Sequence, residues 1–285
     1  MNGFVIALKS ELFIARNTFS SKFILFAPAA FAILQSLLTW LTEVGTSTRN
    51  NLMSNSNFDD IVNLNAYGHF VDGMSTGLTI LGLLVVAQAA YSFSYDRDTG
   101  IVRHILIRRA SRPALILAKL FQINLLAITS IAILMIASYL MSGFLWEFGA
   151  IIEDGFELIS EEEILAEISM GLKLAIVPLP AAIAFGLFVS TIAQSATQAI
   201  TTALGITLAI DIFKSMLGSY ADYLYARFQP SLIDASYLQD VSRIVRGYSD
   251  VLVNADVLQL NLWAPLPAFV IFVGLTIFSI KRKNI

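Results

Sequence analysis

Long apolar stretches separated by short polar segments dominate the pattern along the chain. A helix that crosses a bilayer needs about 20 mostly apolar residues, because each residue rises 1.5 Å and the hydrocarbon core is about 30 Å thick. Stretches of suitable length cover residues 23–42, 74–93, 119–145 and 263–280. The pattern therefore predicts membrane-spanning helices at these places.

A further apolar region, residues 172–217, is too long for a single span. As one helix it would measure about 69 Å, more than twice the thickness of the core, so the chain must turn back within it. The turn is predicted at a polar cluster formed by Gln194, Ser195, Thr197 and Gln198. Spans at 172–192 and 196–217 then bring the total to six. The expected fold class is all-α: a single polytopic transmembrane domain over residues 1–285, with connecting loops at 43–73, 94–118, 146–170 and 218–262.

Composition supports a membrane protein and excludes several kinds of site. Of the 285 residues, 56% are hydrophobic and 14% are charged, so a water-soluble fold would expose large apolar patches. The chain has no cysteine, which excludes disulfides and thiolate sites. Its two histidines, His69 and His104, are predicted on opposite sides of the membrane and cannot share a site. We expect no enzymatic activity, no metal, no directly bound cofactor and no nucleic-acid partner.

Basic residues gather on one side of the predicted spans. The N-terminal segment, the loop 94–118 with its border at Lys119, and the C-terminal tail hold 12 of the 18 Lys and Arg residues. Because Lys and Arg favour the cytoplasmic side, both termini are expected in the cytoplasm. Trp40, Trp146 and Trp263 then fall at the outer ends of spans, where indole sits well between headgroups and lipid tails. The expected location is the cytoplasmic membrane of a bacterium or archaeon.

The N-terminal residues 2–21 are apolar enough to bind lipid but too charged to cross it. Lys9, Glu11 and Arg16 interrupt an apolar stripe that recurs at the helical period, formed by Phe4, Leu8, Leu12, Ala15 and Phe19. We expect an amphipathic helix in the membrane interface, with its basic residues near anionic headgroups. It either anchors the first span or transmits motion into that span.

The loop 94–118 carries the most specific pattern in the chain. Asp96 and Asp98 precede Gly100, which tolerates positive φ and is expected to end the helix that emerges from the membrane. Residues 101–109 suit a short helix with one apolar side, and Ser111 suits the N-cap of the next helix. The alternative is a loop whose basic residues only keep it on the cytoplasmic side. Such a loop would explain the arginines, but not the acids, the glycine and the apolar side together. We therefore interpret the loop as a docking element.

In this order of residues the loop resembles the cytoplasmic loop of ABC type-2 transporter permeases. In that family the loop forms a coupling helix that sits in a cleft of the ATPase subunit. The six spans and the N-terminal helix also resemble the family, so the resemblance covers nearly the whole chain, although only about 25 residues carry its specific part.

The resemblance implies a set of ATPase-coupling residues, and it places Lys119 on the family's lysine at the start of the next span. The set comprises Asp96, Asp98, Gly100, Ile101, Ile105, Leu106, Arg108, Arg109, Ser111 and Arg112. Two members depart from the family pattern: Ile101 replaces a usual threonine, and Arg109 stands where a proline is common. Both departures bear on how the coupling helix ends and on which ATPase it meets.

The chain contains no G-x-x-x-x-G-K-[ST] phosphate-binding loop, so ATP and Mg²⁺ are expected on a separate cytoplasmic ABC ATPase subunit. The resemblance implies the permease subunit of an ATP-driven exporter, paired with a second permease subunit, identical or related, and working by rigid-body alternating access. One alternative is a secondary transporter, which should place ionisable coupling groups near the bilayer midplane. Another is a non-transporting ABC membrane subunit that relays ATPase motion to an extracytoplasmic partner.

The fourth and fifth spans contain residues that are unusual in lipid. Asp211 and Lys214 lie three positions apart, where they can form an intramembrane ion pair on one helical face. A structural pair and a place on the substrate path both stay open. Pro178 and Pro180 predict a bend in the fourth span.

Two outer loops carry patterns of their own. The segment 146–170 contains eight acidic residues and no basic one, and its Ser160 and Glu163 form a capping box that could start a helix. This segment is either a solvated acidic helix or a surface that recruits a cationic substrate or an extracytoplasmic partner. In the loop 218–262, an amphipathic stripe from Tyr237 to Val245 is expected to pack across the outer mouth.

Overall fold

The computed structural model describes residues 3–53, 65–101, 111–153, 156–232, 236–246 and 254–282. Within these residues, six helical stretches are long and apolar enough to cross a membrane, at Phe19–Arg49, Ala66–Asp98, Arg112–Leu145, Glu161–Ile192, Ala196–Phe213 and Ala255–Arg282. The predicted all-α polytopic fold with six spans is confirmed, and the chain is an integral membrane protein.

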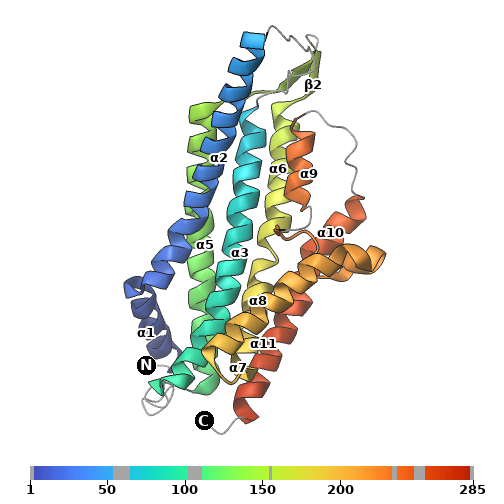
Figure 1. Ribbon diagram of the computed structural model, residues 1–285. Helices are drawn as coiled ribbons and strands as arrows, with labels where there is room; N and C mark the ends of the chain where they lie inside the picture. The colour runs from blue at the N-terminus through green and yellow to red at the C-terminus, as the bar shows by residue number, and fades with distance from the viewer. Residues whose placement is uncertain are drawn as a thin grey trace.

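Helices account for nearly all of the described chain, and a single short β-ribbon lies in its middle (Figure 1). The described elements are, in chain order, α1 (Gly3–Asn17), α2 (Phe19–Met53), α3 (Ala66–Asp98), α5 (Arg112–Leu145), β1 (Ile151–Glu153), β2 (Phe156–Ile159), α6 (Glu161–Ile176), α7 (Leu179–Ile192), α8 (Ala196–Phe213), the 3-10 helix η2 (Lys214–Tyr223), α9 (Tyr237–Ile244), α10 (Ala255–Trp263) and α11 (Pro265–Arg282). Both termini lie at one end of the bundle, which we call the proximal end, and the β-ribbon lies at the opposite, distal end (Figure 1).

The helix α3 forms the centre of the bundle and packs against α2, α5, α7, α8 and α9. It approaches α7 closely because Gly186 has no side chain: a Cβ there would lie 2.8 Å from the carbonyl oxygen of Val86. Small residues at such contacts let helix backbones come together in a membrane, where lipid removes the hydrophobic drive between helices. The central position of α3 brings it into contact with helices on all sides of the bundle.

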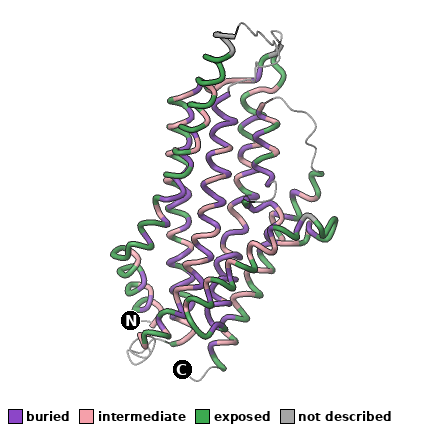
Figure 2. The backbone as a smooth tube through the Cα atoms, in the orientation of Figure 1, coloured by how far each residue is buried: buried purple, intermediate pink, exposed green. Residues whose placement is uncertain are grey.

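The burial pattern matches a lipid environment. Figure 2 shows α3 buried along most of its length, while the outward faces of α2, α5 and α11 are exposed. The exposed positions on these faces include large apolar side chains such as Phe31, Ile128 and Val270. Hydrocarbon accommodates such side chains at no cost, whereas water would not.

The predicted turns within the apolar region 172–217 are present. The fourth span is divided at Val177 and Pro178 into α6 and α7, as the prolines predicted. The chain then turns back between Ile192 and Ala196, where the side chain of Ser195 caps α8 by accepting from the backbone N–H of Gln198 at 3.2 Å. The polar cluster therefore forms the hairpin between two spans.

Several element boundaries differ from the predicted ones. The interfacial helix ends at Asn17 instead of residue 21, and α8 ends at Phe213 instead of residue 217, where the chain continues as η2. Conversely, α2, α3 and α6 extend into the predicted loops 43–73 and 146–170. Polar residues can continue a helix beyond the membrane when capping side chains or water provide hydrogen-bond partners for its terminal backbone groups. The predicted capping box of Ser160 and Glu163 starts α6.

The distal end contains two elements that rest on the spans. Strands β1 and β2 pair antiparallel within the acidic segment 146–170, where the sequence predicts no strand. The helix α9 packs on α3 and α6 through the predicted stripe, in which Leu238, Val241 and Val245 are fully buried. The stripe is therefore the face by which α9 packs on the spans, and its place at the outer mouth stays a prediction.

Candidate functional site

The predicted coupling residues divide into two groups. Those at the two ends of the loop lie in the described chain, at the end of α3 and the start of α5. Four residues of the loop lie outside the described residues: Ile105, Leu106, Arg108 and Arg109. The candidate site is therefore built from the anchored ends of the loop and from what they contact.

The helix α3 ends at the predicted glycine. Gly100 has φ +75°, and its N–H donates to the carbonyl of Arg97 at 3.1 Å, while the N–H of Thr99 donates to Tyr95 at 2.9 Å. This left-handed residue after the helix is a common C-terminal cap that favours glycine. The chain leaves α3 through Thr99 and Gly100, and Ile101 is the last described residue on this side of the loop.

The next helix begins as predicted. The side chain of Ser111 accepts from the N–H of Ala114 at 3.3 Å, and Pro113 lies in the first turn of α5. Arg112 donates to the carbonyl of Ile280 near the end of α11, at 3.4 Å. The start of α5 is thus connected to the last span as well as to the loop.

A buried ion cluster joins three elements at the proximal end. The Nζ atom of Lys119 on α5 lies 2.6 Å from Oδ2 of Asp96 on α3 and 3.0 Å from Oε1 of Glu11 on α1. The side chain of Lys119 is 3% exposed and that of Glu11 is 6% exposed. Burial raises the pKa of the Glu11 carboxyl, and Lys119 beside it acts in the opposite direction. One ammonium group therefore holds two carboxylates from separate helices.

The position of Glu11 adds an inward-facing side to α1 that the apolar stripe did not predict. The buried residues of α1 are Ala7 and Glu11, one helical turn apart, whereas Leu12 on the predicted apolar stripe is exposed. Lipid solvates large apolar side chains as well as a protein core does, so the small and the ionic residues turn inward. A signal for this was present in the sequence, since an acid amid apolar residues of an interfacial helix needs a partner.

Asp98 contacts a different part of the bundle. Its Oδ2 accepts from the backbone N–H of Ala196, at the N-terminus of α8, at 2.9 Å. Its Oδ1 accepts from the guanidinium group of Arg97 at 3.4 Å. Asp96 and Asp98 are two positions apart on one helix, which places them about 200° apart around its axis. The two acids therefore fasten α3 to opposite neighbours, Asp96 to α1 and α5, and Asp98 to α8.

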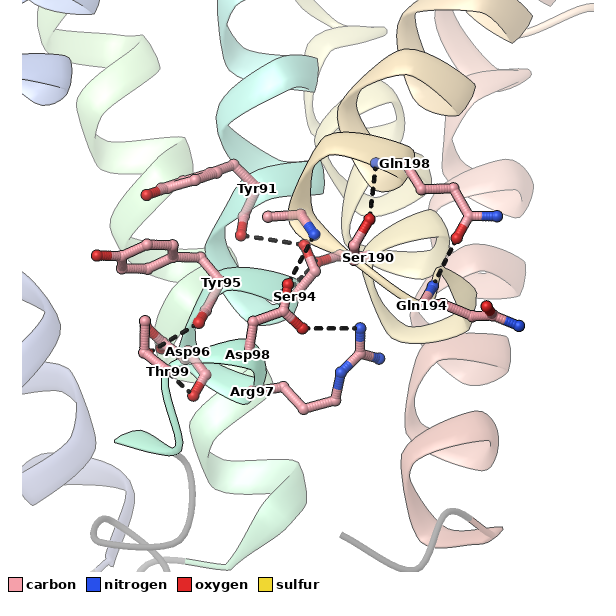
Figure 3. A network of polar contacts seen from close by, with 12 residues as sticks. Tyr91, Ser94, Tyr95, Asp96, Arg97, Asp98, Thr99, Ser190, Gln194 and Gln198 are labelled. Carbon is pink, nitrogen blue, oxygen red and sulfur yellow. Dashed lines mark hydrogen bonds and ion pairs between the residues drawn. The ribbon is translucent and has the colours of Figure 1, made fainter.

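A second polar contact strengthens the connection of α3 to the α7–α8 hairpin. The N–H of Ser94 donates to Oγ of Ser190 on α7 at 2.9 Å, and both side chains are fully buried. At the hairpin, Gln198 accepts from the N–H of Gln194 at 2.9 Å. Figure 3 shows these residues grouped around the last turn of α3. We call the contacts of Ser94, Asp96 and Asp98 together with Glu11 and Lys119 the proximal network.

The predicted ion pair on α8 forms where the helix ends. Nζ of Lys214 lies 3.6 Å from Oδ1 of Asp211 and donates to the carbonyl of Gln229 at 3.4 Å. Lys214 is fully buried and Asp211 is nearly so. The contact with Gln229 connects the segment after η2 to the end of α8.

The distal acids are partly used within the chain. Glu161 accepts from the hydroxyl of Tyr67, and Glu167 accepts from that of Tyr237 at 2.9 Å. Burial and the neighbouring Glu167 raise the pKa of Tyr237. In addition, Asp72 on α3 lies 2.5 Å from Arg246, just after α9. These contacts hold α9 and α6 against α3, so the acidic segment is more than a solvated face.

Across the described ranges no cluster of three or more His, Asp or Glu side chains could hold a metal ion. Residues 48–285 match the family described as "Protein of unknown function (DUF2705)", and the chain belongs to that family. No curated protein and no solved structure matches the chain. The function must therefore be argued from the site.

Proposed function

We propose that this DUF2705 protein is the permease subunit of an ATP-driven ABC exporter, in which a separate ATPase subunit hydrolyses ATP and the spans move substrate by alternating access. The observation that supports it best is the proximal network. Asp96 and Lys119 flank the loop on either side, and they meet in one buried ion cluster with Glu11 of α1. A partner that pulls on the loop therefore acts on α1, α3 and α5 together.

The network suits the transmission of force because its members are buried and charged. Separating Lys119 from its two carboxylates inside the protein would leave uncompensated charges, at a cost of about 3–5 kcal/mol. Motion of the loop is therefore less costly as a rigid-body movement of the attached helices than as a local separation. Through Asp98, the same movement reaches the N-terminus of α8.

The geometry refines which residues would contact the ATPase. Asp96 and Asp98 are engaged inside the chain, so their role in coupling is to connect the loop to the spans. Docking then falls to the loop itself, including Ile105, Leu106, Arg108 and Arg109, and to Ile101 at its border. Ser111 and Arg112 hold the other border of the loop on α5 and α11.

The orientation follows from the same end of the bundle. The helix α1, the start of α2 and the end of α11 lie at the proximal end (Figure 1), together with the end of α3 and the start of α5. These parts of the chain carry the basic residues Lys9, Arg16, Lys22, Arg97, Arg112 and Lys281. We place this end in the cytoplasm of a bacterium or archaeon, by the preference of basic residues for that side. A cytoplasmic ATPase could then reach the loop.

A second permease subunit, identical or related, would complete the transport path. A groove of about 440 Å³ lies between α2, α3 and α8, and it contains polar side chains of Ser20, Gln88 and Tyr91 among apolar ones. The helix α8 buries only Ala199, Ala203 and Asp211, so most of its surface is open to lipid or to a second subunit. We propose this face as the side on which the two subunits enclose the substrate.

One alternative has specific support. The central helix α3 runs without a break from Asp98 in the proximal network to Asp72, which binds Arg246 at the distal end. Such an arrangement would also serve a non-transporting subunit that relays ATPase motion to an extracytoplasmic partner. A secondary transporter has less support, because the ion pair of Asp211 and Lys214 is satisfied within the chain.

Co-purification in mild detergent tests the proposal directly. Recovery of a phosphate-loop ATPase in an amount equal to the permease is expected, and its repeated absence would favour a secondary transporter. Replacement of Thr99 by cysteine tests the orientation: a membrane-impermeant thiol reagent should label it only after the membrane is opened. Labelling in intact cells would place the loop on the wrong side and remove the basis of the proposal.

The role of the network needs a readout of motion. Spin labels at the distal ends of α2 in two subunits should report an ATP-dependent change in distance. Glu11→Gln should keep ATPase association but reduce this change, whereas Glu162→Gln, which removes the same charge from an exposed position on α6, should not. If substrate is transported while the distance between the spin labels stays unchanged, alternating access is contradicted. If ATP changes that distance but no substrate is transported, the non-transporting relay subunit is favoured.

A further inference from the structure

A groove of about 690 Å³ opens on the lipid-facing surface between α1, the start of α2, and α5. Its walls combine two kinds of side chain. Arg16, Ser21 and Lys22, close in sequence to the α1–α2 junction, and Gln122 near the start of α5 supply charged and polar groups. Apolar side chains such as Leu25, Phe26 and Ile133, further along α2 and α5, supply a hydrocarbon-like wall.

The groove follows from how the N-terminal helix is attached. Glu11 holds the middle of α1 on α5 through Lys119. The chain then turns at Thr18, whose hydroxyl donates to the carbonyl of Ile14 at 2.7 Å and lies 3.2 Å from the hydroxyl of Ser21. Deeper in the bundle, Ser130 of α5 donates to the carbonyl of Ile24 on α2 at 2.9 Å. The helices α2 and α5 are thus fastened behind the groove, and the end of α1 covers it on one side.

The length of the groove equals the depth of one lipid leaflet. On α5 it extends from Gln122 to Ile133, which at 1.5 Å per residue is about 16 Å. Half of a hydrocarbon core of about 30 Å is about 15 Å. An acyl chain that starts beside Gln122 would therefore lie in the groove down to the bilayer midplane.

The charged side chains of the groove are available to a ligand. Neither Arg16 nor Lys22 pairs its side chain with a carboxylate among the described residues, and both side chains are exposed. The side chain of Gln122 lines the groove and is 6% exposed, so its amide is a polar group that a ligand in the groove would meet.

We propose that this groove binds one anionic phospholipid, with its phosphate at Arg16 and Lys22, a headgroup or ester oxygen at Gln122, and one acyl chain along α2 and α5. Two positive charges without acidic partners select an anionic headgroup over a zwitterionic one. The walls of the groove carry exposed Leu12, Phe26 and Leu125, so the groove opens into hydrocarbon where such lipids are present. This assignment rests only on the chain being a membrane protein and does not depend on transport or on an ATPase.

Because the lipid would lie between α1 and the spans beside the Glu11–Lys119 contact, it would fill the space on the open side of α1. Removing it should loosen α1 while leaving the ion cluster in place. The lipid is thus a structural partner of the interfacial helix.

Native mass spectrometry of the detergent-purified full chain tests the proposal, with phosphatidylglycerol or phosphatidylcholine added at defined concentrations. One phosphatidylglycerol should be retained per chain in preference to phosphatidylcholine. Arg16→Gln with Lys22→Gln should weaken retention about thirty-fold, the effect of two basic residues near an anionic surface. The matched control, Lys9→Gln with Lys281→Gln, removes two exposed charges that do not line the groove and should change retention less than threefold, roughly within the scatter of such surface effects.

A steric variant separates the groove from general charge attraction. Ala132 is an exposed residue that lines the apolar part, so Ala132→Phe fills the groove without changing charge or the buried core. It should reduce phosphatidylglycerol retention as strongly as the double charge variant, with unchanged helix content by circular dichroism. Equal losses in both charge pairs, equal retention of the two lipids, or no effect of Ala132→Phe would each overturn the proposal. A change in oligomeric state with Ala132→Phe and unaltered lipid retention would instead assign the groove to a second copy of the chain.

Discussion

Replacement of Lys119 by methionine is the sharpest test of the proximal network. Methionine retains most of the length of the side chain but removes the ammonium, which lies 2.6 Å from Asp96 and 3.0 Å from Glu11. Removing one partner of a buried ion pair costs about 3–5 kcal/mol, because the remaining charge is left without compensation. Here two carboxylates are left facing each other, so the free energy of unfolding should fall by an amount in the upper part of that range.

The variants of the two acids should be milder, because each leaves a matched pair. Glu11→Gln leaves Lys119 with Asp96 at the shorter distance, and Asp96→Asn leaves it with Glu11 at the longer one. The expected order of destabilisation is therefore Lys119→Met first, Asp96→Asn second and Glu11→Gln last. The triple variant that neutralises all three groups should be more stable than Lys119→Met alone, since no charge is then stranded.

Reversible unfolding in mixed micelles, followed by circular dichroism, measures these differences. Lys9→Met serves as the control, because Lys9 lies on the same helix α1 but is exposed, and it should change the free energy of unfolding by less than about 0.5 kcal/mol. A cost of Lys119→Met below about 1 kcal/mol, within the range for an exposed pair, would refute the assignment of a buried cluster. A triple variant less stable than Lys119→Met would refute the electrostatic account of it.

The other predictions concern pH, caps and packing. Burial holds the folded-state pKa of Glu11 above its ordinary value of 4.5, so folding takes up a proton; the stability this provides is complete below 4.5 and is lost as the pH rises through the folded-state pKa. Lys119 counteracts the rise in the pKa of Glu11, so Lys119→Met should lose stability more steeply than the wild type as the pH increases from 4.5 through the folded-state pKa. Unfolding measured at several pH values checks this. Gly100→Ala places a Cβ at φ +75° with no atom within 4 Å, so it should cost about 1–2 kcal/mol from backbone strain alone, measured by thermal unfolding. Asp98→Ala removes the carboxylate that accepts from the N–H of Ala196 in the first turn of α8, beside the Ser195 cap; it should cost about 1 kcal/mol, with faster hydrogen exchange confined to that turn. Gly186→Ala brings a Cβ to 2.8 Å from Val86 and should cost about 1–3 kcal/mol, whereas Gly274→Ala, with open space around it on α11, should not destabilise.

Predictions that depend on neighbouring residues in the chain agree well with the structure. Gly100 ends α3, Ser111 and Ser160 cap α5 and α6, and the cluster around Ser195 forms the hairpin between two spans. Such features depend on backbone hydrogen bonds within about four residues, so the local sequence contains the information that decides them. The boundaries were less accurate, because helices continue past the membrane wherever polar side chains and caps permit.

The hydrophobic pattern by itself determined that the chain crosses a membrane six times, because the length of an apolar run is set by the thickness of the bilayer. Only the tertiary structure decided which polar residues meet. Glu11 lies more than a hundred positions from Lys119, and Asp98 lies nearly a hundred from Ala196, yet both pairs are in contact. No local pattern encodes these partners, since they result from how α1 and α8 pack around α3. In lipid, apolar faces carry little information about packing, so the few buried charges and small residues decide the arrangement, and their partners become known only when the helices are placed together.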